Sequence, residues 1–103
     1  MAKAYGSIGI VFSEQSNYSK ALQFHLKAVK IYELIKDDKK CAQVYNNIGV
    51  EYKSQNNDFK ALEYFFKAQN IQKKLNDPTI GITLTNIANC YLKQKNNEKA
   101  IEY

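Results

Sequence analysis

Tyr45-Asn46-Asn47-Ile48-Gly49-Val50-Glu51-Tyr52 is the stretch that decides the fold, because its pattern occurs three times in the chain. The pattern is a large residue, then Ile beside a small residue, then an aromatic residue. Its other copies are Tyr5, Ile8, Gly9 and Phe12, and the weaker Leu84, Ile87, Ala88 and Tyr91. A repeat at a fixed interval of this size indicates stacked supersecondary units, which points to binding as the mode of action.

A second motif follows the first in the same register. It reads Lys20-Ala21-Leu22, then Lys60-Ala61-Leu62, then Lys99-Ala100-Ile101. The interval is 40 residues from Gly9 to Gly49 and 39 residues from Gly49 to Ala88. Each unit therefore contains two elements, one for each motif.

Both elements are predicted to be helices, because apolar residues recur at helical spacing and no segment alternates as a strand does. Breaks rich in Asn and Asp separate the apolar stripes, and these residues cap helices. Asp77-Pro78 is the best boundary, since it reads as an N-cap followed by proline at the first helical position. The predicted helices are Ala2–Gln15, Tyr18–Ile35, Lys39–Ser54, Phe59–Leu75, Pro78–Lys95 and Glu98 to the end of the chain.

Short turns make neighbouring helices antiparallel. The sequence thus predicts one array of helical hairpins over residues 1–103, with units at 1–37, 38–76 and 77–103 and the last of them truncated. Gly9, Gly49 and Ala88 are expected where helices cross closely, because glycine inside a helix costs up to about 1 kcal/mol relative to alanine and needs a packing reason.

Composition narrows the class of protein. The chain has 103 residues, of which 45% are hydrophobic and 24% charged, as in a folded soluble domain. No apolar run approaches the roughly 20 residues that span a bilayer, and no signal peptide is recognisable, so a cytoplasmic protein without membrane contact is expected.

The net charge is +5, and all 15 basic residues are lysine. Arginine supplies the bidentate contacts to phosphate and guanine that lysine cannot make, so a nucleic-acid partner is not expected. We interpret most of the charge as solvation of helix faces, with attraction of an acidic protein partner as the alternative.

Residues that could support catalysis are sparse. Cys41 and Cys90 have no second metal ligand at a suitable spacing, and His25, the single histidine, lies on an apolar stripe. The chain also lacks a glycine-rich phosphate loop. We therefore expect no enzyme, no metal site and no cofactor.

The repeated residues resemble the tetratricopeptide repeat, and the resemblance covers the whole chain. The middle unit matches best, with Tyr45, Ile48, Gly49, Tyr52, Ala61, Phe65 and Ala68. His25 departs from the expected aromatic residue, and the usual Trp and unit-closing Pro are absent. The resemblance implies an all-α, right-handed superhelical solenoid of about two and a half repeats. The long repeat looks like those of kinesin light chains, cell-polarity adaptors and bacterial sensor proteins, which bind peptides and protein segments.

In such a solenoid the first helices line a concave groove. Their side chains outside the core are Lys3, Gly6, Ser7, Ile10 and Ser13 in the first unit, Gln43, Asn46, Asn47, Val50, Lys53 and Ser54 in the second, and Ile82, Thr85, Asn86, Asn89, Lys93 and Gln94 in the third. The candidate peptide-binding residues among these are Asn46, Asn47, Val50, Lys53, Thr85, Asn86, Asn89 and Lys93.

Asn47 and Asn86 are the sharpest of these candidates. An Asn amide offers a donor and an acceptor together, which suits the backbone of an extended peptide. The resemblance implies that both hold a ligand backbone, whereas a solvated polar helix face is the alternative interpretation. The carboxylate clamp known in short-repeat relatives is not expected here, because Asn47 is the only one of the clamp's residues that this chain has. Lys53 and Lys93 could still attract an acidic ligand.

The chain ends at Tyr103, one turn into the second helix of the third unit. We therefore expect a fragment of a longer array, whose exposed face around Ile87 and Tyr91 could be covered by another copy. Two functions stay open: a scaffold that binds a protein segment in the groove, and a structural spacer or self-association module with an empty groove.

Overall fold

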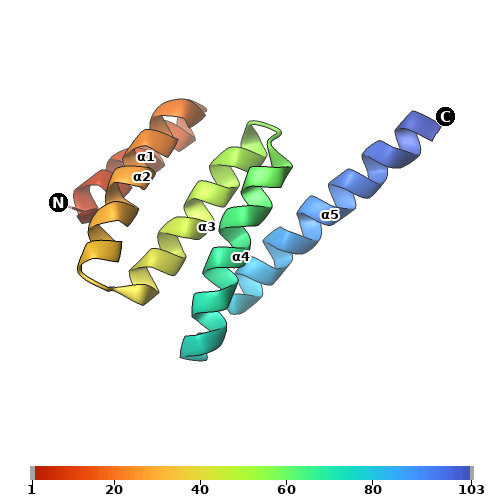
Figure 1. Cartoon of the computed structure of the whole chain (residues 1–103). Helices are drawn as coiled ribbons and strands as arrows, with labels where there is room; N and C mark the ends of the chain where they lie inside the picture. The colour runs from red at the N-terminus through yellow and green to blue at the C-terminus, as the bar shows by residue number, and fades with distance from the viewer. Residues whose placement is uncertain (1, 103) are drawn as a thin grey trace.

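The computed structural model describes the backbone of residues 2–102 and the side chains of residues 2–93. Within that range the chain forms an all-α solenoid of about two and a half hairpins, and no strand occurs in the part described (Figure 1). The helices are α1 (Ala2–Glu14), α2 (Tyr18–Leu34), α3 (Asp38–Ser54), α4 (Asp58–Leu75) and α5 (Ile80–Glu102). Consecutive helices pack side by side, as the sequence predicts.

The turns between helices share one backbone design. Each places a residue in the left-handed region at equal intervals along the chain: Ser16 (φ 61°), Lys36 (φ 58°), Asn56 (φ 63°) and Asn76 (φ 52°). The next residue caps the following helix in the first three turns, where a side-chain oxygen of Asn17, Asp37 or Asn57 accepts from the backbone N–H three positions later. The predicted breaks around these residues are confirmed.

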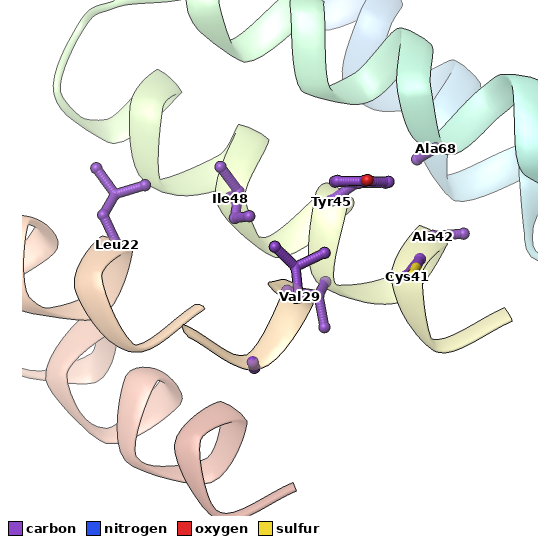
Figure 2. Packing of buried hydrophobic residues seen from close by; sticks show 9 residues of the cluster. Leu22, Val29, Cys41, Ala42, Tyr45, Ile48 and Ala68 are labelled. Atoms are coloured by element: carbon purple, nitrogen blue, oxygen red, sulfur yellow. The ribbon is translucent and has the colours of Figure 1, made fainter. Parts of the chain in front are cut away.

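The main core lies between α2, α3 and α4, as Figure 2 shows for Leu22, Ile48 and Ala68. Ile48, Ala28 and Ala68 have no exposed surface. Alanine at these positions lets the helix axes approach closely, while the larger neighbours fill the space between turns. The predicted stripe of the middle unit is therefore the centre of the fold.

The motif glycines mark the closest crossings within a hairpin. A Cβ on Gly49 would lie 2.6 Å from Cδ1 of the fully buried Phe65, and one on Gly9 would lie 2.8 Å from Cε1 of His25. Such distances are too short for carbon atoms in contact. The prediction of close crossings is confirmed at these two positions, and His25 occupies in the first hairpin the place that Phe65 has in the second.

The prediction for Ala88 is wrong. Its side chain is exposed, and α5 instead buries Thr83, Ile87 and Cys90. Gly9 and Gly49 each face the second helix of their own hairpin, whereas α5 packs on α4 of the preceding hairpin and has no second helix of its own in the described part of the chain. Without a crossing helix, the small residue has nothing to accommodate.

The start of α5 also differs from the prediction. Asp77 closes a turn ahead of the helix and is not the N-cap predicted, since its Oδ1 accepts from the backbone N–H of Thr79 at 2.9 Å and from its hydroxyl at 2.7 Å. These bonds hold Pro78 and Thr79 in a turn, so the α-helix begins at Ile80 and not at Pro78.

The predicted break at Asn96-Asn97 is wrong, because α5 continues through it to Glu102 and extends away from the other helices (Figure 1). A turn there would give up helical hydrogen bonds. Residues 98–103 provide less than two turns, at about 3.6 residues each, with which to recover that free energy by packing. The helix predicted from Glu98 onward is part of α5.

Faces at the two ends of the array are less buried than their motifs predict. Ile8 is 40% exposed, whereas the matching Ile48 is fully buried. Leu84 and Tyr91 are 44% and 52% exposed for the same reason. A terminal hairpin has a neighbour on one side only, so half of its apolar surface stays uncovered.

Candidate peptide-binding groove

The first helices α1, α3 and α5 line two hollows. The α1–α3 hollow has a volume of about 160 Å³ and the α3–α5 hollow about 370 Å³. The α1–α3 hollow is lined by Lys3, Gly6, Ser7, Ile10, Tyr32, Lys40, Gln43, Val44 and Asn47. The α3–α5 hollow is lined by Gln43, Asn46, Asn47, Gln72, Thr79 and Ile82. Gln43 and Asn47 border both hollows, so the two hollows adjoin and form one groove.

Asn47 has the most central position of the predicted site residues. It lies on α3 between the two hollows, and its side chain is half-buried. Its amide forms no side-chain hydrogen bond with the described residues. The donor and the acceptor of Asn47 are both available to a ligand, as peptide-backbone recognition requires.

Asn46 has a structural role that the sequence does not indicate. Its Nδ2 donates to the Thr83 hydroxyl at 2.7 Å, and this hydroxyl donates to Oε1 of Gln72 at 2.5 Å. Nε2 of Gln72 then donates to the Thr79 hydroxyl at 3.2 Å. This buried chain ties α3, α4 and α5 together beneath the α3–α5 hollow.

The chain of bonds ends at Asp77. The Thr79 backbone N–H and hydroxyl both donate to this carboxylate and lower the pKa of Asp77. One buried acceptor, Oδ1 of Asn46, has no partner within the described residues. A buried polar atom without a partner is unfavourable for the stability of the fold.

The other predicted site residues lie farther along the same helices and do not line either hollow. Val50 is 39% exposed on α3, and Lys53 is half-buried one turn later. On α5, Asn86 is half-buried, while Thr85 and Asn89 are exposed. The Thr85 hydroxyl donates to the Gly81 carbonyl at 2.9 Å. Gln94 has its side chain outside the described range.

Lys93 points to the α3–α4 turn. Its Nζ donates to Oδ1 of Asn56 at 2.8 Å and lies 3.7 Å from Oδ1 of Asp58. The Asn56 oxygen orients this ammonium group, and the Asp58 carboxylate partly neutralises it. An acidic ligand would have to compete with them for Lys93.

Five residues that line the hollows were missed: Tyr32, Lys40, Val44, Gln72 and Thr79. Val44 lies on α3 and is buried. Tyr32 and Gln72 come from second helices, Lys40 lies in the first turn of α3, and Thr79 lies in the turn before α5. Register was the signal that could have found them. Tyr32 and Gln72 occupy matching positions of successive repeats, as do Lys40 and Thr79.

The remaining reactive side chains are buried in the core. His25 is 1% exposed, and burial lowers its pKa, which keeps the ring neutral. Burial also raises the pKa of both free thiols, Cys41 and Cys90. Across the described range no three His, Cys, Asp or Glu side chains gather as metal ligands would.

Comparison with known proteins identifies the family. Two family profiles match the sequence, each described as Tetratricopeptide repeat, one over residues 1–74 and the other over residues 83–103. The chain belongs to the tetratricopeptide-repeat family. No curated protein matches it in sequence.

A solved structure shows the same fold. It is the N-terminal domain of stress-induced protein-1 (STI-1) from C. elegans, which superposes with a TM-score of 0.69 at 20% sequence identity. The match covers 85% of this chain and 68% of that one. As a tetratricopeptide-repeat array the chain is a protein-interaction module. No described helix is both long and apolar enough to cross a membrane.

Proposed function

We propose that the chain holds an extended segment of another protein in the groove formed by α1, α3 and α5. The observation that carries this proposal is the pair of adjoining hollows on the first helices, with Asn47 between them. A segment lying across both hollows would place its backbone against the free amide of Asn47. Its side chains would then enter the hollows on either side.

The role of Asn86 follows from the repeat. Asn47 and Asn86 each precede the Ile of their motif, and both side chains are half-buried on a first helix. Two amides one repeat apart would hydrogen-bond to the ligand backbone at two points, and the hollows would select among ligand side chains. Backbone recognition of this kind binds many sequences weakly unless the hollows select among them.

Replacing both Asn47 and Asn86 by alanine should weaken binding about tenfold, because each lost amide costs a ligand hydrogen bond of about 0.5–1.5 kcal/mol. Peptides would first be selected on the wild-type chain from an unbiased displayed library. Fluorescence anisotropy of a labelled selected peptide then measures affinity, and far-UV circular dichroism should show unchanged helicity.

The matched control replaces Gln23 and Asn70, two exposed amides of α2 and α4, by alanine. This variant should bind as the wild type does. If the two double variants have equal affinity, the assignment of Asn47 and Asn86 fails. If no peptide is selected at all, the peptide-binding function fails with it.

Self-association is the second candidate function, and one surface favours it. An apolar hollow of about 470 Å³ between α4 and α5 is lined by Phe59, Leu62, Glu63, Phe66 and Tyr91. Phe59 is 82% exposed and the adjoining Leu92 is 59% exposed. An uncovered apolar patch of this kind marks an interaction surface.

If a second copy covers this patch, sedimentation velocity at low micromolar concentration should show dimers, and Phe59→Glu should return the chain to a monomer. Asn70→Glu is the control, since it makes the same change of charge at an exposed position of α4 outside the hollow. A wild-type chain that sediments as a monomer throughout would remove this candidate.

A further inference from the structure

The two hollows of the groove are one site repeated in successive units. Every residue that lines the α3–α5 hollow has its repeat partner in the α1–α3 hollow: Gln43 with Lys3, Asn46 with Gly6, Asn47 with Ser7, Gln72 with Tyr32, Thr79 with Lys40, and Ile82 with Gln43. Six shared backbone positions therefore line both hollows, which differ in the side chains at these positions and in volume. Those differences define what each pocket accepts.

Charge is the main difference. The α1–α3 hollow has Lys3 and Lys40 where the α3–α5 hollow has Gln43 and Thr79. The single ion pair in the described range joins Lys93 to Asp58, so neither Lys3 nor Lys40 has a carboxylate within 4.0 Å there. Two lysines from two helices, neither paired with a carboxylate of the described residues, therefore line one small hollow.

Neighbouring groups do not cancel this charge. Asp38 and Asp37 are the nearest acids in sequence to Lys40, but neither lines the hollow, and Oδ1 of Asp37 accepts from the Lys40 backbone N–H as the cap of α3. Lys3 and Lys40 also lie in the first turns of α1 and α3. Helix N-termini carry a partial positive charge, which adds to that of the two lysines.

Gly6 adds room to the α1–α3 hollow. A Cβ at Gly9 would strike His25, but a Cβ at Gly6 would meet no described atom within 4 Å. Packing of the chain therefore gives no reason for the cost of up to about 1 kcal/mol that glycine imposes inside a helix. Gly6 lines the α1–α3 hollow together with both lysines, and its missing side chain leaves room for a ligand to approach the backbone.

We propose that the α1–α3 hollow is a carboxylate subsite. It takes an Asp or Glu side chain of the bound segment between Lys3 and Lys40, while the α3–α5 hollow takes an uncharged polar side chain at its amides and hydroxyl. The inference rests on the proposed peptide binding. It assigns the acidic preference to Lys3 and Lys40, and not to Lys93, which is already paired.

The register of a bound segment follows from this difference. A chain that could slide by one repeat would move its carboxylate from two ammonium groups to Gln43 and Thr79, which cannot neutralise it. The charged hollow thus fixes which residue of the segment lies where. Asn47, between the hollows, binds the backbone in either register.

The test starts from an unbiased displayed peptide library selected on the wild-type chain. Enriched sequences should share one acidic position followed or preceded at a constant spacing by an uncharged polar one. Affinity of a labelled enriched peptide should fall at about 0.5 M salt, because exposed charge pairs are screened. Its version with Glu replaced by Gln should bind about tenfold more weakly.

The double variant Lys3→Gln/Lys40→Gln should lose about tenfold in affinity for the acidic peptide and nothing for the Gln version. Lys73→Gln/Lys74→Gln removes the same charge from the end of α4, outside both hollows, and should leave both affinities unchanged. Lys40→Glu should shift the preference to a peptide with Lys at the acidic position. The carboxylate subsite is overturned, and peptide binding kept, if the enriched peptides share no acidic position or if the two double variants lose equal affinity. If no peptide is enriched, both the subsite and the proposed peptide binding are overturned.

Gly6→Ala provides a readout that a structural role would not produce. Alanine favours the helix and meets no described atom, so this variant should melt at the same or a higher temperature than the wild type. Its Cβ should nevertheless weaken binding of the acidic peptide. A Gly6→Ala variant with full affinity would remove the argument from Gly6.

Discussion

Replacing Gly49 by alanine should lower the free energy of unfolding by about 2 kcal/mol, although alanine is the better helix former by up to about 1 kcal/mol. The added methyl group would overlap the ring of Phe65, since its carbon would lie 2.6 Å from Cδ1 and 2.9 Å from Cζ. Phe65 is fully buried, so its ring cannot move aside without displacing the core of the second hairpin. Urea unfolding followed by circular dichroism measures the loss.

Gly81→Ala is the matched control, because a Cβ there meets nothing within 4 Å among the described residues. It should leave stability unchanged or raise it. In the double variant Gly49→Ala/Phe65→Leu the smaller side chain gives way to the methyl group, so Phe65→Leu should cost less there than in the wild type. Equal stability of Gly49→Ala and the wild type would show that the crossing tolerates a larger separation.

Glu51→Gln should raise the free energy of unfolding at neutral pH by about 2 kcal/mol, the scale of the penalty for a buried charged group without a full set of partners. Glu51 is 3% exposed, and its Oε2 has no hydrogen-bond partner among the described residues. Burial raises the pKa of Glu51, and the nearby Ser13 hydroxyl opposes the shift only in part. Gln has the same shape but no charge to desolvate.

The pH dependence tests the cause of this effect. A carboxyl whose pKa is raised by folding binds its proton more tightly in the folded state, so stability falls as pH rises from the ordinary pKa of glutamate to the raised value. The advantage of Glu51→Gln should thus be complete above the raised pKa and vanish near pH 4, where both states are protonated. Glu14→Gln, at an exposed position of α1, should show no such advantage. A constant difference across this range would contradict the assignment to charge burial.

Much of the fold could be predicted because each unit repeats the same capping residues and the same apolar stripes. Asn17, Asp37 and Asn57 cap helices in the structure as they do in the sequence pattern, and Ile48 and Ala68 are buried where the stripes place them. These features depend on contacts between residues close in sequence or one repeat apart. A motif that recurs in register identifies such contacts directly.

Features at the ends of the array could not be predicted in this way. Ala88 and Tyr91 match the motif but are exposed, because burial requires a neighbouring helix and not the residue alone. Asn96-Asn97 matches the turn at Asn56-Asn57, yet α5 continues through it. The same local signal gives a turn only where the following helix gains enough packing to offset the lost helical hydrogen bonds.

The candidate site could be predicted as far as the helices that form it. Asn47 borders both hollows from α3, whereas Lys40 enters from the start of that helix and Tyr32 and Gln72 enter from second helices. Their positions depend on how far a hairpin tilts against the next one, which no motif specifies. Asn46 shows the converse, because a polar residue on the predicted face donates inward to Thr83.

The arrangement of contacts has a consequence for elasticity. Each described helix packs mainly on the helices next to it in sequence, while the first helices α3 and α5 touch only lightly across the groove. The curvature of the array is therefore set along its outer side, and its inner side is free to widen or narrow. A segment bound across α1, α3 and α5 would brace that open side, making the coil stiffer and fixing its pitch.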